Sequence, residues 1–348
     1  MPRIPASAVA AFGLTLAAAL GLQACRTPPA AEVIAADGVL CDITQRLAAG
    51  DLQVLCLLQP GEDPHQFRLT PQQSRELSQA QLVLINGYGL TPALTNLAKP
   101  GAGPTRTVAV AERAVPDSPV LTAAMPVAAD PHGHDEGVHE EGDTHDGGGH
   151  AHGDRDPHVW HDPRQAAALV TGVAEQLSQL KPAARERINA RAEAMTSTLQ
   201  QLDAWNRRQL ATINAPRRLA TGHRAFASLA RAYGLQELAV VDATSSSANL
   251  RPQAFQAVVA QLKREQVPML FAEQLPPGKA LQRVSSLSGV PIAAKPLVPD
   301  GLAPEPGGNG NLVATLTANI CLIAEGLDGR CDRAGAAALE LRWRAIDN

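Results

Sequence analysis

Short apolar runs alternate with amphipathic helical segments in the first part of this chain. Apolar runs at Glu32 to Leu40 and Asp51 to Leu58 predict two strands, with a helix over Asp42 to Ala49 between them. A helix that starts at Thr70-Pro71 and a third strand over Gln81 to Gly89 follow. Because strand and helix alternate, the pattern predicts a parallel sheet with crossover helices.

The middle of the chain changes to a purely helical pattern. From Pro163 to about Ile213 the sequence is rich in Ala, Leu, Gln, Glu and Arg, and its apolar residues recur at helical spacing. The pattern predicts helices over most of this segment, with a break near Lys181-Pro182. A long helix here would act as a stiff strut between the segments on either side.

A second strand-helix series follows. Strands are predicted at 217–222, 237–243, 268–273 and 290–299, with Asp300 just past the end of the last one, and helices are predicted after His223, at 252–267 and at about 311–325. The chain is too long for one ordinary core, so we expect an α/β protein with two lobes. The predicted organisation is an N-terminal lobe at 32–162, a linking helical region at 163–213 and a C-terminal lobe at 214–348.

The N-terminus predicts export. Residues 1–24 contain one Arg and an uncharged apolar run from Ala8 to Leu22, too short to cross a bilayer, which indicates a signal peptide. The segment Leu22-Gln23-Ala24-Cys25 resembles a bacterial lipobox, although Gln23 replaces the usual small residue. We expect Cys25 to be acylated and 25–31 to be a tether; alternatively, cleavage occurs nearby and Cys25 is lost or stays free.

Because the protein is expected to be exported, we expect the other four cysteines to form disulfides. Cys41, Cys56, Cys321 and Cys331 allow three pairings, and we favour Cys41 with Cys56 and Cys321 with Cys331 because each pair is close in sequence. A thiolate zinc site would need tighter spacing. Unpaired buried thiols are the alternative.

The amino-acid composition excludes one class of binding partner. The formal net charge is -4, and three Trp, two Tyr and five Phe leave little for base stacking, so nucleic acid is excluded as a partner. We expect a monomer.

Histidines are concentrated in one acidic, glycine-rich tract. Eight of the ten histidines fall between His132 and His161. Six of them lie in the tract itself: His132, His134, His139, His145, His150 and His152. Imidazoles interleaved with carboxylates suit Zn²⁺ or its first-row neighbours, so we expect a disordered loop at about 128–155 that collects metal weakly. The alternative is a solvated insertion without a role.

Three further histidines follow apolar runs or turns in separate segments: His65, His158 and His223. Three imidazoles leave tetrahedral zinc one ligand short, and either Asp300 or water completes the set. Since ligands of open α/β sheets bind beyond the strand C-termini, the positions of His65, His223 and Asp300 favour one shared site. His161 could share a helix face with His158, but we leave it outside the set.

Nearby carboxylates have two possible roles. Asp63, Asp156 and Asp162 either orient the imidazoles or cap turns.

Several motifs together resemble one known family. GEDPHQFRLTPQQ, QLVLINGYG and DPHVWHDP are similar to motifs of the cluster A-I solute-binding proteins of zinc and manganese ABC importers, and the likeness covers nearly the whole mature chain. The resemblance implies two (β/α)₄ lobes with parallel sheets, joined by a long rigid helix. It places the metal ligands on His65, His158 and His223, with Asp300 at a position that is a ligand in some members and vacant in others.

The resemblance also bears on the metal. The acidic His-rich loop and a histidine at position 223, where manganese binders usually carry Glu, point to the zinc-specific branch. Glu273 matches an acidic residue of the family, and we assign it no role at this point.

The function that this implies is a receptor rather than an enzyme. We expect a periplasmic or membrane-anchored protein that captures Zn²⁺ between its lobes and delivers it to a permease and an ATPase. The alternatives are a periplasmic metal buffer or chaperone, a Mn²⁺ receptor of the same family, and a zinc hydrolase, which the absence of H-E-x-x-H disfavours.

Overall fold

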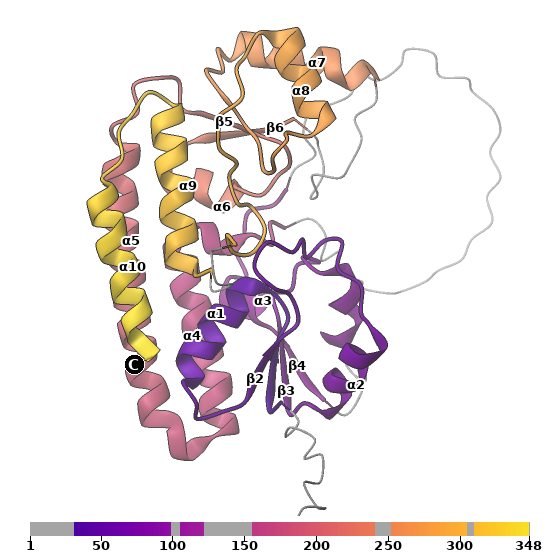
Figure 1. Ribbon diagram of the computed structural model, residues 1–348, viewed down its shortest axis with the longest axis vertical. Helices are drawn as coiled ribbons and strands as arrows, with labels where there is room; N and C mark the ends of the chain where they lie inside the picture. The colour runs from indigo at the N-terminus through magenta and orange to yellow at the C-terminus, as the bar shows by residue number, and fades with distance from the viewer. Residues whose placement is uncertain (1–30, 99–104, 122–154, 241–251, 305–309, 348) are drawn as a thin grey trace, which may run out of the picture. The chain divides into compact units, whose positions relative to one another are not determined.

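The computed structural model describes residues 31–98, 105–121, 155–240, 252–304 and 310–347 (Figure 1). The predicted signal peptide, Cys25 and the six histidines of the acidic tract lie outside the described residues. No helix within the described ranges is long and apolar enough to cross a membrane.

The first lobe is built on a four-stranded parallel sheet with the strand order β2-β1-β3-β4. Its strands are β1 (Val33–Ala35), β2 (Val54–Cys56), β3 (Leu82–Ile85) and β4 (Arg106–Ala109). Its helices are α1 (Gly38–Ala48), α2 (Pro71–Gln79), η1 (Pro92–Ala98) and α3 (Val110–Ala114). The sequence did not predict β4 or α3.

Helix α1 begins earlier than predicted. The run from Glu32 to Leu40 was taken as one strand, but β1 ends at Ala35 and the helix starts at Gly38. The cause is Asp37, whose Oδ1 accepts a hydrogen bond from the backbone N–H of Leu40 at 2.9 Å and so caps the helix.

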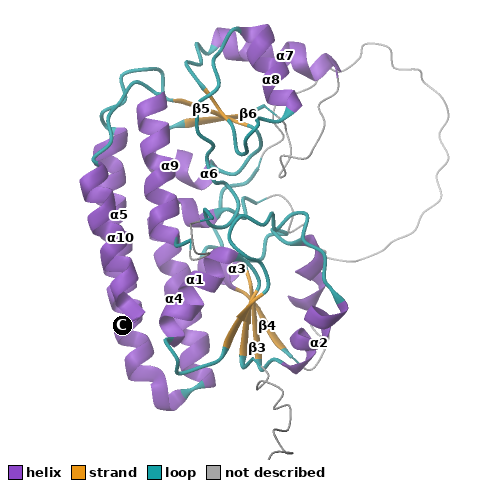
Figure 2. Cartoon of the chain, in the orientation of Figure 1, coloured by secondary structure: helices purple, strands orange, loops and turns teal. Residues whose placement is uncertain are grey.

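Two long helices follow as a hairpin, α4 (Pro163–Leu180) and α5 (Arg185–Leu210) (Figure 2). The predicted break is confirmed, because α4 ends before Pro182 and a single 3-10 turn, η3 (Pro182–Ala184), joins the two helices. Helix α5 packs against α4, α1, α9 and α10. The hairpin therefore contacts elements from both ends of the chain.

The second lobe has a smaller parallel sheet, with the order β6-β5-β7. Its strands are β5 (Arg218–Thr221), β6 (Gln236–Ala239) and β7 (Leu270–Phe271). The helices in this part of the chain are α6 (Ala227–Tyr233), α7 (Pro252–Arg264), α8 (Lys279–Ser288), α9 (Leu312–Gly326) and α10 (Arg333–Arg344), followed by η4 (Ala345–Asp347). Two lobes with parallel sheets and a long helix confirm the predicted fold class.

Two predictions for the C-terminal part were wrong. The segment 290–299 was expected to be a strand, but within the described residues its strand pairing is limited to one parallel bridge, between Leu270 and Ile292. The segment contains three prolines, which have no N–H to donate: Pro291, Pro296 and Pro299. Helix α9 was expected to be the last helix, but α10 follows it and is capped by Asp332, whose Oδ1 accepts from Gly335 N at 2.9 Å.

One hydrophobic core connects the two lobes. Strand β1 alternates its side chains, so that Val33 and Ala35 join the cluster on the α4–α5 side while Ile34 joins a second cluster with α2. The first cluster contains residues from both lobes, from Val33 of β1 to the buried Trp343 of α10. The lobes are thus coupled through shared packing.

Both predicted disulfides are present. Cys41–Cys56 joins α1 to the end of β2, with 5.5 Å between the Cα atoms. Cys321–Cys331 joins α9 to the segment before α10, with 5.1 Å between the Cα atoms.

Candidate metal site

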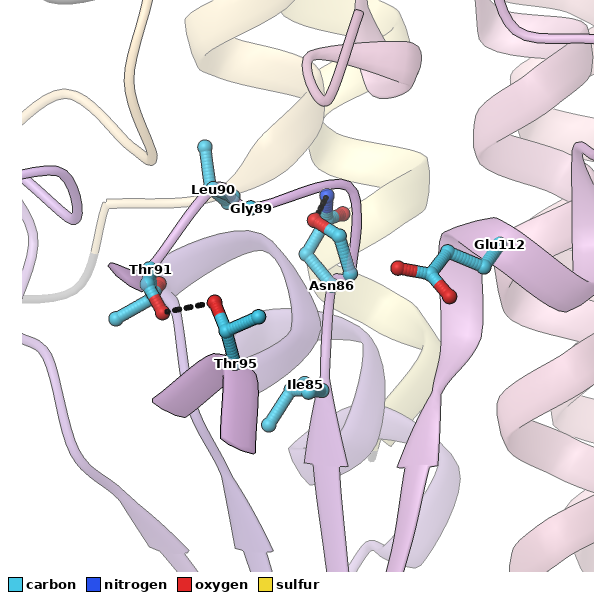
Figure 3. A pocket seen from close by; sticks show the side chains of 8 residues that line it. Ile85, Asn86, Gly89, Leu90, Thr91, Thr95 and Glu112 are labelled. Atoms are coloured by element: carbon cyan, nitrogen blue, oxygen red, sulfur yellow. Dashed lines mark hydrogen bonds between the residues drawn. The ribbon is translucent and has the colours of Figure 1, made fainter. Parts of the chain in front are cut away.

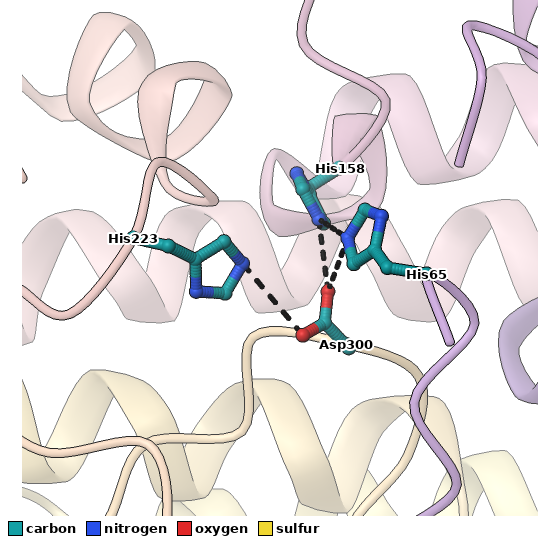
Figure 4. Close-up of side chains that lie close together, drawn as sticks. All are labelled: His65, His158, His223 and Asp300. Carbon is teal, nitrogen blue, oxygen red and sulfur yellow. Dashed lines mark hydrogen bonds and ion pairs between the residues drawn. The ribbon is translucent and has the colours of Figure 1, made fainter. Parts of the chain in front are cut away.

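Four side chains from four separate segments converge on one point (Figure 4). They are His65, His158, His223 and Asp300. One potential ligand atom from each lies within 4.8 Å of the other three. The structure therefore brings together the four candidate ligands.

The spacing of three of these atoms matches one face of a four-coordinate site. The Nε2 atoms of His65 and His158 are 3.3 Å apart, and Asp300 Oδ1 lies 3.2 Å and 2.9 Å from them. His223 Nε2 lies 3.6 Å from Asp300 Oδ2 and has no hydrogen-bond partner. A zinc ion with N and O ligands at about 2.0–2.1 Å has tetrahedral edges of roughly 3.3–3.4 Å. The separations among His65 Nε2, His158 Nε2 and Asp300 Oδ1 lie near this value, and His223 completes the group within 4.8 Å.

The first two histidines sit on identical Asp-Pro-His turns. Asp63 Oδ1 accepts from the backbone N–H of His65 at 2.8 Å, and Asp156 Oδ1 accepts from that of His158 at 2.9 Å. An Asp that bonds the backbone two residues ahead forms an Asx turn. The tripeptide thus fixes the backbone at both ligands.

His158 receives additional support from Asp156, which is fully buried. The Nδ1–H of His158 donates to Asp156 Oδ1 at 2.9 Å, so Nε2 faces the site. The other oxygen, Oδ2, accepts from both the N–H and the hydroxyl of Ser228 at 3.0 Å. Asp156 therefore orients one ligand and holds the first turn of α6 in the second lobe.

His223 is oriented in the same way by Glu273. Each follows its strand by two residues, His223 after β5 and Glu273 after β7, and because these strands are parallel neighbours both side chains reach the same edge. The Nδ1–H of His223 donates to Glu273 Oε2 at 2.9 Å, and its backbone N–H donates to Oε1 at 3.0 Å. A Cβ at Gly222 would lie 2.6 Å from Glu273 Oε2, so a larger residue would displace the carboxylate.

Asp300 belongs to an irregular segment, residues 297–304, which we call the Asp300 loop. Helix α9 holds this loop through two polar side chains. Asn319 accepts from Val298 N at 2.9 Å and donates to Val298 O at 2.8 Å. Thr315 Oγ1 accepts from Ala303 N at 3.0 Å.

Two further hydrogen bonds tie the Asp300 loop to residues outside the second lobe. Gly61 N–H donates to Leu302 O at 3.0 Å, and His161 Nε2–H donates to Pro299 O at 2.9 Å. His161 is buried and lies against Phe226, with 4.6 Å between ring centroids. Its side chain contacts the backbone next to a ligand rather than joining the ligand group.

The electrostatics favour a proton-filled site when metal is absent. Burial favours neutral imidazoles, but Asp156 and Asp300 outweigh it and raise the pKa of His158 to about 9. Burial opposes charge at His223 too, but Asp300 and Glu273 raise its pKa to about 10. Burial would raise the pKa of Asp300, yet its contacts with His158, His223 and His65 hold it well below its usual range. Metal would replace these protons.

His161 has the opposite character. Burial lowers the pKa of His161 to about 4, and the hydrogen bond to the backbone carbonyl of Pro299 compensates for burial only in part. It is therefore neutral over the physiological range.

A small cavity of about 30 Å³ lies in the first lobe (Figure 3). It is lined by Asn86, Glu112, Thr91 and their neighbours, and it has room for about one water molecule. Asn86 Nδ2–H donates to Pro157 O at 2.9 Å. This region supports the turn that carries His158.

Three imidazoles and one carboxylate form a donor set that suits a borderline transition metal. The comparison with known proteins agrees with this chemistry. Residues 33–326 match the family described as zinc-uptake complex component A, periplasmic (ZnuA). The chain belongs to the ZnuA family.

Relatives of this ZnuA-family chain carry names with different metals. The zinc-binding protein TroA of Treponema pallidum is 27% identical over 300 residues, which cover 85% of this chain and 88% of TroA. The manganese ABC transporter substrate-binding lipoprotein PsaA of Streptococcus pneumoniae is 25% identical over 318 residues, which cover 91% of this chain and 95% of PsaA. The family predicted from the motifs is confirmed.

Solved structures show the same ZnuA-family architecture. The periplasmic zinc-binding protein TroA from Treponema pallidum aligns with a TM-score of 0.68 and 26% identity, covering 85% of this chain and 98% of that one. Fe(III)-bound YtgA from Chlamydia trachomatis aligns with a TM-score of 0.69 and 23% identity, covering 86% and 99%. The second likeness shows the fold alone.

The sequence predicted only some of the residues that support the candidate ligands of this ZnuA-family site. Asp156 was expected either to orient an imidazole or to cap a turn, and it does both, whereas Asp63 caps its turn and Asp162 caps α4 through Arg164 N at 2.9 Å. Glu273 had no assigned role, although its place directly after a predicted strand was a usable signal. Nothing in the sequence indicated that His161 contacts Pro299.

Proposed function

We propose that this protein is the extracytoplasmic receptor of an ABC importer and that its cargo is Zn²⁺. His65, His158, His223 and Asp300 would hold the ion before it is delivered to a permease and an ATPase. The observation that carries this proposal is the convergence of four potential ligand atoms within 4.8 Å of one another, with two of the imidazoles oriented by buried carboxylates.

The donor set favours zinc over manganese. Manganese prefers carboxylate, carbonyl and water oxygens, whereas imidazole suits zinc. Here nitrogen outnumbers oxygen, because His223 supplies a third imidazole. A Mn²⁺ receptor is the second candidate, and the similarity to PsaA supports it.

Capture and anchoring extend the proposal to parts of the chain outside the described residues. The signal peptide at 1–24 would direct export, and acylated Cys25 would anchor a monomeric receptor at the outer face of the cytoplasmic membrane. The six histidines of the acidic tract would collect metal weakly near the tight site. Deleting 131–154 should then slow zinc uptake by starved cells, and unchanged uptake would remove the collector role.

The central test is a zinc titration by calorimetry in competition with a chelator. The mature protein from Arg26 onward should show one tight site, which His223→Ala abolishes, and weak sites, which only the deletion of 131–154 removes. The same titration with Mn²⁺ should give clearly weaker binding. Tight binding that survives His223→Ala would overturn the ligand assignment, and tighter binding of Mn²⁺ would overturn the choice of zinc.

A receptor differs from a periplasmic buffer in its dependence on a transporter. Zinc uptake should require both this protein and its permease in the same cells. Unchanged uptake in cells that lack the protein would favour a buffer or chaperone instead.

A further inference from the structure

His161 connects three of the segments that carry the candidate ligands. It follows His158 by one 3-10 turn, η2 (Val159–His161), its ring lies against Phe226 just after His223, and its Nε2–H donates to Pro299 O beside Asp300. The hydrogen bond joins positions 138 residues apart. No other side chain in the described ranges makes a hydrogen bond to this carbonyl.

The direction of this hydrogen bond follows from its acceptor. A carbonyl oxygen can only accept, so Nε2 must carry the proton and Nδ1 must be unprotonated. Nδ1 is buried and has no partner. Leaving a polar atom buried and unpaired destabilises the fold, so an apolar side chain of similar size between Trp160 and Phe226 would suit the core better.

The benefit of a histidine at this position must therefore come from its bond to Pro299. The Asp300 loop belongs to no strand, and Pro299 and Pro304 each lack a backbone donor. Helix α9 holds the loop at Val298 and Ala303, and backbone hydrogen bonds hold it at Leu297 and Leu302. His161 holds Pro299, the residue directly before Asp300.

We infer that His161 is a positioning residue that keeps Asp300 in the site and thereby slows metal release. This inference depends on the proposed function as a metal receptor. Because the bond acts on one ligand after the ion is enclosed, it should affect the dissociation rate far more than the association rate. Breaking it would free Asp300 while the three imidazoles stay in place.

Two substitutions at the same position separate the hydrogen bond from packing. His161→Phe keeps an aromatic ring of similar size but has no donor, whereas His161→Gln can present an N–H near the position of Nε2. Zinc release into an excess of chelator, followed by stopped flow, should be on the order of tenfold faster for His161→Phe, and His161→Gln should recover most of the wild-type rate. Association rates should change less than about threefold.

A double-mutant cycle with Asp300→Ala tests whether His161 acts through this ligand. Without the carboxylate, His161→Phe should change the release rate less than about twofold. The metal-free His161→Phe protein should melt near the wild-type temperature, because loss of the unpaired Nδ1 offsets loss of the donor to Pro299 O. Met195→Ala, a destabilising change in the core of α5, is the control and should lower the melting temperature without changing zinc release.

The outcomes distinguish the inference from the proposed function. If the wild-type protein holds zinc tightly but His161→Phe releases it at the wild-type rate, or releases it equally faster with and without Asp300, the positioning role is wrong. If the wild-type protein itself fails to bind zinc or manganese tightly, the proposed receptor function is wrong, independently of His161.

Discussion

The same tripeptide, Asp-Pro-His, occurs at two ligands but in two different surroundings. In both turns the aspartate accepts from the backbone N–H of the histidine, at 2.8 Å for His65 and 2.9 Å for His158. In the first, Asp63 uses its second oxygen for the exposed side chain of Gln66 at 2.6 Å. In the second, buried Asp156 also holds the imidazole itself and Ser228.

The difference separates what a local motif does from what tertiary packing does. The tripeptide sets the backbone turn wherever it occurs. Only burial beside α6 makes the aspartate orient a ring and join two lobes. Asp156 therefore orients His158 in advance, whereas the hydrogen bonds of the His65 ring within the described residues go to other candidate ligands.

The largest expected effect comes from replacing Asp156, compared with the same substitution at Asp63. Asp156→Ala should weaken zinc binding about 100-fold and destabilise the fold by about 3 kcal/mol, because it deletes the partner of a buried ion pair and the acceptor for Ser228. Asp63→Ala should stay within about threefold in affinity. Calorimetry and urea unfolding measure both, and equal losses for the two variants would contradict the contrast.

A second effect concerns how the His65 turn is anchored. Cys56 ends β2, the strand that leads to this turn, and its disulfide to Cys41 closes a sequence separation of 15 residues. The double variant Cys41→Ser/Cys56→Ser should lose about 3 kcal/mol of folding free energy in urea unfolding. Zinc affinity should change less than threefold, and a loss above tenfold would show that the covalent link holds His65 in place.

The stability of the fold should depend on pH through Glu237, a residue of β6 that contacts the backbone just before α6. Glu237 accepts from Ala225 N and Phe226 N, and burial, reinforced by the charge of Asp156, raises its pKa to about 7. A folded pKa above the unfolded value means that the contribution to stability is complete below about pH 4.5 and is lost as pH rises through 7.

Metal-free wild-type protein should therefore lose about 2 kcal/mol from this group between pH 5 and pH 8, by unfolding free energy. Glu237→Gln should remove this part of the slope. An identical slope in both proteins would show that Glu237 does not titrate in this range.

The smallest effect extends the comparison to the third histidine, which has no Asp-Pro-His turn. Glu273→Gln should weaken zinc binding roughly tenfold, since the buried carboxylate orients His223 through Nδ1. Glu62→Gln is the matched control, because this exposed carboxylate beside the His65 turn bonds only Gln59 N. Comparable losses in the two variants would contradict the role of Glu273.

Much of the architecture followed from the sequence. Apolar runs separated by helical periodicity located β1, β2, β3, β5, α2 and the break between α4 and α5. The errors have local causes: Asp37 caps α1 inside an apolar run, and three prolines prevent 290–299 from pairing as a strand. Neither effect changes hydrophobic periodicity, so the pattern could not reveal it.

The candidate site could be predicted only in part. The sequence singled out the four candidate ligands because each follows a strand or turn and few histidines lie outside the acidic tract, and the structure brings them together. The contacts of Asp156 with Ser228 and of His161 with Pro299 join positions 72 and 138 residues apart. Such contacts depend on how the two lobes pack, which no local motif encodes.

The most direct test of the metal site is X-ray absorption spectroscopy of the zinc-loaded protein lacking 131–154. The account predicts three imidazole nitrogens and one carboxylate oxygen at about 2.0–2.1 Å, with no sulfur ligand. Four ligands of which only two are imidazoles, or a six-coordinate shell of oxygens, would contradict the assignment of His65, His158, His223 and Asp300 as the set that holds zinc.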